Sequence, residues 1–319
     1  MPDSWMAAVR TRLFGISPDE ARLETRGFRS TTPEKQQRLE DAGRAFIHGY
    51  LVALKSADAR QTASDCEGLS PQLRGFAYEG GAMGLAIIDL VTRGRPRLFQ
   101  SFVEGPAITH KYMAHVGAGW ALARCPWGRF TFAPHLDPLL KWLAIDGLGF
   151  HEGFFHGATE IGRGRPSRKR QVGPEAFDNG LGRAMWFATG ARAGLVIQTI
   201  GAFPSERQAA LWSGIGLAVT YAGGASPSEL EEIHAAAGRN RHELALGSAF
   251  AAKARLLAEN PTDDTARACR ALCDMDLAEA AALTDECLTH VPAPYGPDAY
   301  WRWRHVIKSE FDRRQSGTS

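Results

Sequence analysis

The sequence predicts an all-α protein. Apolar residues recur at three- and four-residue spacing along most of the chain, whereas the alternation typical of strands is scarce. Capping residues beside proline or acidic residues mark helix starts at Ser70-Pro71, Asp137-Pro138, Ser205, Ser226-Pro227 and Thr262. A chain of 319 residues with 44% hydrophobic residues can bury a core without help from a metal or a disulfide.

Internal similarity predicts how these helices are organised. The motif Gly-x-x-Phe occurs three times, at separations of 104 and 100 residues: Gly43–Phe46, Gly147–Phe150 and Gly247–Phe250. Two further sets of similar strings keep the same order: Phe76–Gly80 with Phe177–Gly180, and His115–Trp120 with Trp212–Leu217. We therefore expect duplicated helical repeats of about 100 residues.

The repeats divide the chain into a segment at 1–42, one copy at 43–142, a second copy at 143–246, and a partial third copy with the tail at 247–319. We expect them to form one continuous globular unit, packed as an α/α array or bundle. The alternative is an irregular helical bundle without duplication.

Glycine is costly inside helices, so its repeated use predicts close helix contacts. Each helical glycine costs roughly 1 kcal/mol relative to alanine. Gly80 and Gly84, and likewise Gly153 and Gly157, are four residues apart and share one helix face. A face without side chains lets two helix backbones approach each other.

A polar residue precedes a glycine in four apolar neighbourhoods: His48-Gly49, Glu79-Gly80, Glu152-Gly153 and Asn179-Gly180. Repeats related by rotation would bring these groups to one cavity. A buried glutamate has a raised pKa and suits general acid or base catalysis, so we predict catalytic roles for Glu79 and Glu152, with His48 or His115 as partner. The alternative is that each polar group only bonds a neighbouring backbone group.

Aromatic and polar residues of the same segments are predicted to line the cavity and bind a ligand. They are Tyr78, Trp120, Phe150, His151, Phe154, His156, Asn179, Trp186 and Trp212.

The sequence predicts neither a metal site nor a cofactor. His151 and His156 are five residues apart, which on a continuous helix places them about 140° apart rather than on one face. A carboxylate-rich site built from Glu79, Glu152, His48 and His156 stays open as an alternative. Phosphate-binding loops of the P-loop and dinucleotide types are absent.

A basic segment is predicted to dock an acidic partner such as an acyl carrier protein or a polyketide synthase. It contains Arg163, Arg165, Arg168, Lys169 and Arg170. The alternative is a solvated loop. The net charge of +2 is too small to predict nucleic acid as a partner.

The remaining features predict a cytoplasmic protein. The first 27 residues contain no apolar stretch of signal-peptide length, and no apolar run reaches the roughly 20 residues that span a membrane. The five cysteines are scattered without a CxxC pair, so we expect no disulfide framework.

Several strings resemble the domain-of-unknown-function family numbered 1702. They run in family order from about residue 10 to about residue 300 and include Arg74–Gly80, His115–Leu122, Asp146–Gly153, Gly180–Arg183, Trp212–Ala218 and Ala249–Arg255. The resemblance implies a place in bacterial natural-product clusters, including those that make enediyne polyketides. It supplies no catalytic residues, because no active site is settled for that family.

The residues and the resemblance together predict an accessory protein of enediyne polyketide biosynthesis. In the first hypothesis it processes a polyene-derived core intermediate in an apolar helical cavity. In the alternative it is a non-catalytic protein that sequesters the reactive enediyne product or intermediate. A scaffold that joins other biosynthetic proteins is the third hypothesis.

Overall fold

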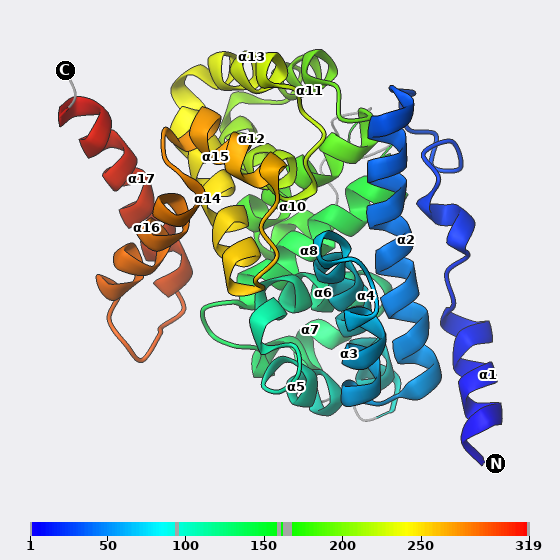
Figure 1. Ribbon diagram of the computed structural model, residues 1–319. Coiled ribbons are helices and arrows are strands. Elements are labelled where there is room, and N and C mark those ends of the chain that lie inside the picture. Colours follow the sequence, from blue (N-terminus) through cyan, green and yellow to red (C-terminus); the bar gives the residue numbers. More distant parts are fainter. Residues whose placement is uncertain (1, 93–95, 158–160, 162–167, 318–319) are drawn as a thin grey trace.

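The computed structural model describes residues 2–92, 96–157, 161 and 168–317, which form an array of helices (Figure 1). No β-strand occurs within these ranges, and the predicted all-α class is confirmed. The central helices each pack against the next one in the chain: α2 (Pro33–Ser56), α4 (Pro71–Thr92), α6 (Lys111–Arg124), α8 (Lys141–Phe155), α10 (Pro174–Ala188), α12 (Ser205–Ala222) and α14 (Arg241–Leu257).

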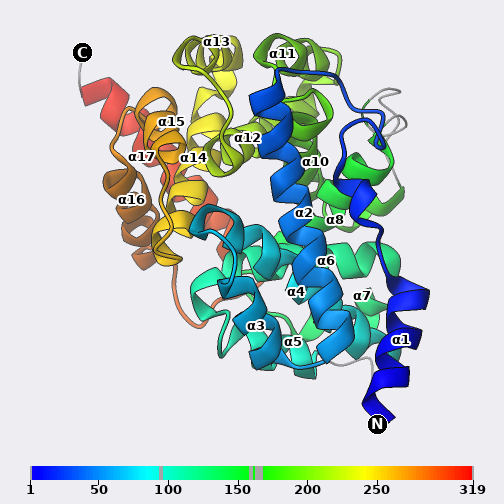
Figure 2. The same cartoon turned by 45° about the vertical axis from the view of Figure 1, so that its right-hand side comes forward.

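Further helices surround the central ones. They are α1 (Pro2–Phe14), α3 (Ala59–Glu67), α5 (Arg97–Val103), α7 (Gly128–Thr131), α11 (Ala193–Gly201), α13 (Pro227–Ala237), α15 (Asp263–Cys273), α16 (Leu277–Thr289) and α17 (Ala299–Gly317). Helices α3, α5 and α7 lie at one end of the array, and α11 and α13 lie at the other (Figure 2). Helix α1 lies beside α2, on the opposite side of the array from α16 and α17.

Local capping determines where several helices begin. Starts are confirmed at Pro71, Ser205, Ser226-Pro227 and Thr262; the Ser226 side chain forms a reciprocal capping box with Glu229. The start predicted at Asp137-Pro138 comes later, because α8 begins only at Lys141. The Asp137 carboxylate accepts hydrogen bonds from the backbone of Leu139 and Leu140, which holds a separate turn before the helix.

Glycine allows the central helices to pack backbone against backbone. In six of these helices, α4 to α14, a first glycine lies on the preceding central helix. A Cβ atom added there would lie 1.8–2.1 Å from a carbonyl oxygen of that helix; the glycines are Gly80, Gly117, Gly147, Gly180, Gly214 and Gly247. The carbonyl comes from the same position of each preceding helix. Gly180 contacts the Asp146 carbonyl, for example, and Gly214 contacts the Asn179 carbonyl. The same contact is therefore repeated from helix to helix.

A second glycine, two residues later, makes the matching contact with the following helix. Gly119, Gly149, Gly182 and Gly216 would each place a Cβ atom 2.0–2.3 Å from a carbonyl of the next central helix. The first glycines recur every 30 to 37 residues, once per central helix. Three such intervals give the period of about 100 residues seen in the sequence. The boundaries expected at 42/43, 142/143 and 246/247 lie inside α2, α8 and α14, and the duplication itself stays a prediction.

The predicted close contacts of the two glycine pairs turn out differently. Gly80 and Gly84 both pack on the backbone of α2, and Gly153 packs against Ala184 of α10. Gly157 lies beyond the end of α8, where the atoms nearest to its added Cβ belong to Ile161 and Phe28. The prediction for Gly157 is therefore wrong, because the helix ends before it reaches that position.

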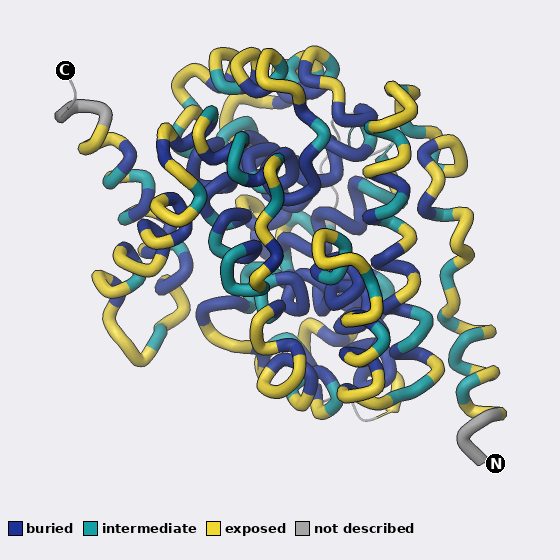
Figure 3. The backbone as a smooth tube through the Cα atoms, in the orientation of Figure 1, coloured by how far each residue is buried: buried dark blue, intermediate teal, exposed yellow. Residues whose placement is uncertain are grey.

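The central helices are buried along most of their length, whereas the outer faces of α13 and α1 are exposed (Figure 3). Most of the buried apolar residues form one continuous core, and a second cluster lies between α14 and helices α15 to α17. In the described part of the chain, no helix is long and apolar enough to cross a membrane.

The glycine contacts should make the stability of the protein sensitive to an added methyl group. Gly147→Ala should lower the free energy of unfolding by at least about 2 kcal/mol, because its Cβ would lie 2.0 Å from the Val116 carbonyl and force α6 and α8 apart. Gly201→Ala in α11 is the matched control, since nothing lies within 4 Å of its Cβ; it should change stability by less than about 1 kcal/mol. Urea unfolding measures both, and equal stabilities would contradict the backbone contact.

Candidate functional site

The inner face of the array carries a stripe of residues set by the glycines. In each helix, the residue just before the first glycine and the residue three positions after that glycine are four residues apart. They are therefore separated by one helical turn, and both face inward. The first position holds Glu79, Asp146 and Asn179; the second holds Trp120, Phe150 and Arg183. These six residues come from α4, α6, α8 and α10 and meet at the centre of the molecule.

A buried polar network occupies this centre. Arg183 Nη1 donates to Asp146 Oδ1 at 2.5 Å, and Asn179 Nδ2 donates to Asp146 Oδ2 at 2.5 Å. The Arg183 guanidinium also lies 4.6 Å from the centroid of the Phe150 ring. Asp146 is thus paired on both carboxylate oxygens, as a buried charge requires.

Glu79 is the acidic group of this network with an unused oxygen. Its Oε1 accepts a hydrogen bond from Trp120 Nε1 at 3.0 Å, while its Oε2 lies 3.9 Å from Arg183 Nη2, beyond hydrogen-bond distance. The side chain is 1% exposed, and within the described residues Oε2 has no hydrogen-bond partner. Burial raises the pKa of Glu79 to about 7, although Arg183 opposes the shift.

Two other polar atoms near this group also lack partners. Tyr221 Oη and Asn179 Oδ1 are buried without a hydrogen bond to any described residue. Burial raises the pKa of Tyr221, so its hydroxyl stays protonated at neutral pH. A cavity of about 40 Å³ beside Arg183 is lined by Asp146, Asn179 and Tyr221.

An aromatic slot leads from Glu79 toward the surface. It is lined by Phe46, Phe76, Trp120, Phe150, Phe154 and Phe187, and its volume of about 30 Å³ holds about two water molecules. Trp120 packs against Phe46 and Phe150, with ring centroids 4.5 and 5.2 Å away. The slot is therefore narrow, and side chains must move before it admits a large ligand.

A wider polar mouth of about 490 Å³ adjoins the slot. Its walls include Arg26, Arg124, His151 and His156, and it shares Ile16, Glu20 and Phe155 with the slot. These three shared side chains therefore separate the slot from the mouth. Phe155 is held in part by Arg26, whose guanidinium lies 5.0 Å from its ring centroid.

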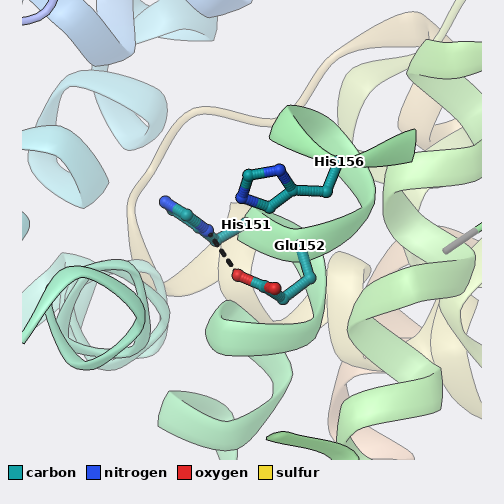
Figure 4. Close-up of side chains that lie close together, drawn as sticks. All are labelled: His151, Glu152 and His156. Atoms are coloured by element: carbon teal, nitrogen blue, oxygen red, sulfur yellow. Dashed lines mark hydrogen bonds and ion pairs between the residues drawn. The ribbon is translucent and has the colours of Figure 1, made fainter. Parts of the chain in front are cut away.

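His151, Glu152 and His156 come together beside the mouth, at the C-terminal end of α8 (Figure 4). His151 Nδ1 lies 3.0 Å from Glu152 Oε1, and Lys169 Nζ donates to the same oxygen at 2.8 Å. Burial raises the pKa of the Glu152 carboxyl, but the bonds from His151 and Lys169 outweigh burial and hold it below its ordinary value. Burial lowers the pKa of His151, which is therefore neutral at pH 7.

The structure separates the four residues predicted to be catalytic. Glu79 is at the inner end of the slot, whereas Glu152 is paired at the mouth. His48 is exposed on α2, because Gly49 contacts the following helix, as the second glycines do, and the residue before such a glycine points away from the inner face. His115 is buried away from both; its Nδ1 donates to the Lys111 carbonyl at 2.7 Å, and its ring packs against Phe99. The predicted partnership of His48 or His115 with a glutamate is not observed.

The predicted ligand-binding residues fall into three groups. Trp120, Phe150 and Phe154 line the slot, and His151 and His156 line the mouth. Asn179 belongs to the central network. The others lie elsewhere, each with its own packing role: Tyr78 stacks on His110 and donates to Glu67, Trp186 donates to the Gly223 carbonyl, and Trp212 is buried on α12.

The predicted docking segment is only partly visible. Arg163 and Arg165 lie outside the described residues, and the backbone of Arg168 is described without its side chain. Lys169 bonds Glu152, and Arg170 makes a bidentate pair with Asp178. These last two residues are thus paired within the protein, and the docking role stays a prediction.

Sequence reasoning missed Asp146, Arg183 and Tyr221. Asp146 precedes Gly147 as Glu79 precedes Gly80, and Arg183 follows Gly180 by the three residues that separate Phe150 from Gly147. Aligning the chain on one glycine pair per helix would have found the first two. Tyr221 has no such signal, because it reaches Phe76 and Gly75 from the far end of α12.

Glu79 should make stability depend on pH. Its folded pKa of about 7 exceeds the ordinary 4.5, so the free energy of unfolding should fall as pH rises between these values and then level off. Glu79→Gln keeps an acceptor for Trp120 and removes the charge. It should match the wild type at pH 4.5 and exceed its stability by roughly 3 kcal/mol at pH 8. Urea unfolding at both pH values tests this; Glu231→Gln, on the exposed face of α13, is the control and should show no such difference.

Comparisons with known proteins identify the family but no characterised relative. No curated protein and no solved structure matches the chain. The family model described as "Protein of unknown function (DUF1702)" matches residues 5–311, which covers nearly the whole sequence. The chain therefore belongs to the DUF1702 family of proteins of unknown function.

Proposed function

We propose that this protein binds the polyene-derived core intermediate of enediyne polyketide biosynthesis in its aromatic slot and processes it by proton transfer at Glu79. The observation that carries the proposal is the slot itself, which is apolar along its walls and ends at a buried carboxyl group. The link to enediyne biosynthesis rests on the family resemblance.

The slot suits an extended, unsaturated chain. Its walls are aromatic rings. Each Å² of apolar ligand surface that they remove from water contributes about 25 cal/mol to the free energy of binding. The polar mouth suits the polar end of the same molecule, since Arg26 and Arg124 line it. An elongated ligand would thus lie with its apolar part toward Glu79, after Phe155 and Ile16 have moved aside.

Glu79 has the properties of a general acid and base. With a pKa of about 7, it is present in both protonation states near neutral pH. Trp120 fixes one oxygen, and the other, 3.9 Å from Arg183 Nη2, has no hydrogen-bond partner in the described part of the chain. Protonation at one carbon of a polyene and deprotonation at another would move its double bonds and return the proton to Glu79.

Incubation with a synthetic linear conjugated polyene in D₂O tests the proton transfer. Catalysis should place deuterium in the recovered polyene, seen as an increased mass together with a changed absorption spectrum. Glu79→Gln should abolish the exchange, because an amide cannot transfer the proton, while the polyene stays bound in gel filtration.

Retention of the polyene without deuterium exchange would instead support the second candidate, a protein that sequesters the intermediate or product. The walls of the slot favour this candidate as well, since they are almost wholly apolar. Exchange that persists at the wild-type rate in Glu79→Gln would remove this glutamate from the mechanism.

The position of the ligand is tested separately. Phe154→Ala should weaken polyene binding at least tenfold, because it removes one wall of the slot. Phe130→Ala is the matched control, since Phe130 is 70% exposed and lies outside the slot. Quenching of tryptophan fluorescence by the polyene measures both affinities, and equal weakening in the two variants would contradict binding in the slot.

A further inference from the structure

We propose that His151, Glu152 and His156 form a binding site for a divalent transition-metal ion, of the Zn²⁺ or Fe²⁺ class, at the mouth. One ligand atom from each residue lies within 4.8 Å of the other two. Two imidazoles and one carboxylate are a donor set that both ions accept, with further positions left open for water or a ligand.

The end of α8 is what brings the two histidines together. On a continuous helix they would point about 140° apart. Helix α8 ends at Phe155, however, and His156 takes φ −124° and ψ 25° while its N–H still donates to the Glu152 carbonyl at 2.8 Å. This departure turns the His156 ring back toward His151, with 6.1 Å between the ring centroids.

The side chains can tighten around an ion. Tetrahedral binding with metal–ligand distances of 2.0–2.1 Å places the donor atoms about 3.3 Å apart, which is closer than they lie here. His151 and Glu152 are buried, with His151 Nδ1 3.0 Å from Glu152 Oε1, so they form a fixed half of the site once the His151 proton is carried on Nε2 and Nδ1 is free to bind the ion. His156 is exposed and has room to rotate toward them.

A metal ion would compete with Lys169 for the Glu152 carboxylate. Lys169 Nζ donates to Glu152 Oε1 at 2.8 Å, so an ion that bonds this oxygen must displace an ammonium group. The Lys169 side chain is 36% exposed, which lets it swing away. Removal of this ammonium should therefore strengthen metal binding, whereas removal of any ligand should weaken it.

The open positions of a bound ion would face the mouth. His151 and His156 both line this mouth, which has a volume of about 490 Å³. A ligand oxygen, from a carboxylate or a carbonyl, could therefore reach the ion. The proposal stands apart from the proposed function, because neither the site nor its test involves Glu79 or a polyene.

Titration of the full chain, freed of tags and dialysed against a chelator, tests the site. Calorimetry with Zn²⁺ should show one ion per chain, and Co²⁺ should give the visible absorption of a four- or five-coordinate complex. His156→Ala and Glu152→Gln should each weaken binding at least tenfold, whereas Lys169→Met should strengthen it at least threefold. His48→Ala, at an exposed histidine elsewhere, is the control and should leave the affinity unchanged.

Three results would contradict a metal site at these residues. The proposal fails if no saturable binding is found, or if His156→Ala changes the affinity less than twofold; His156 is exposed, so its loss should not unfold the chain. Weaker binding in Lys169→Met would also overturn it, because the ammonium would then support the site rather than compete for Glu152. Far-ultraviolet circular dichroism checks that each variant is folded.

Discussion

The close contact of helix backbones through glycine is the constraint on which the rest of this structure depends. At each contact a glycine of one helix lies directly on a carbonyl of its neighbour, where even a methyl group would overlap. A glycine Cα–H group that faces a carbonyl oxygen can interact favourably with it, and such a gain would offset part of the cost of glycine in a helix. Because the contact recurs once per helix, it fixes the rotation of each helix about its axis.

That rotation decides which side chains face inward. With the glycines on the helix contacts, the residues one before and three after the first glycine face the interior. In α4, α8 and α10 these positions include an acid, an acid and an amide, which neighbouring large side chains then shield from water. Asp146 is neutralised by Arg183, and Glu79 is left with the raised pKa that sets it apart from its neighbours. The candidate chemistry is thus a consequence of the packing.

The environment of the Glu152 carboxyl group at the mouth differs from that of Glu79, because the mouth lies where a central helix ends. His156 and Lys169 are exposed in full or in part there, and Lys169 and His151 stabilise the buried Glu152 carboxylate in its charged form. The two carboxyl groups therefore have opposite pKa shifts. Burial without enough partners raises one, and charged or polar partners lower the other. One chain in this way holds a proton-bearing carboxyl in an apolar slot and an ionised carboxylate at its entrance.

The sequence by itself determined the helical class, four of the five helix starts predicted from it, the close contacts of Gly80, Gly84 and Gly153, and the interior position of Glu79, because spacing, capping and the cost of glycine are local properties. Tertiary structure decided which polar residues meet. The same pattern of a polar residue before glycine is buried at Glu79 and exposed at His48, since Gly80 contacts the preceding helix and Gly49 the following one, which turns the two side chains to opposite faces. Likewise His151 and His156 meet only because α8 ends between them, and spacing along an assumed continuous helix predicts the opposite.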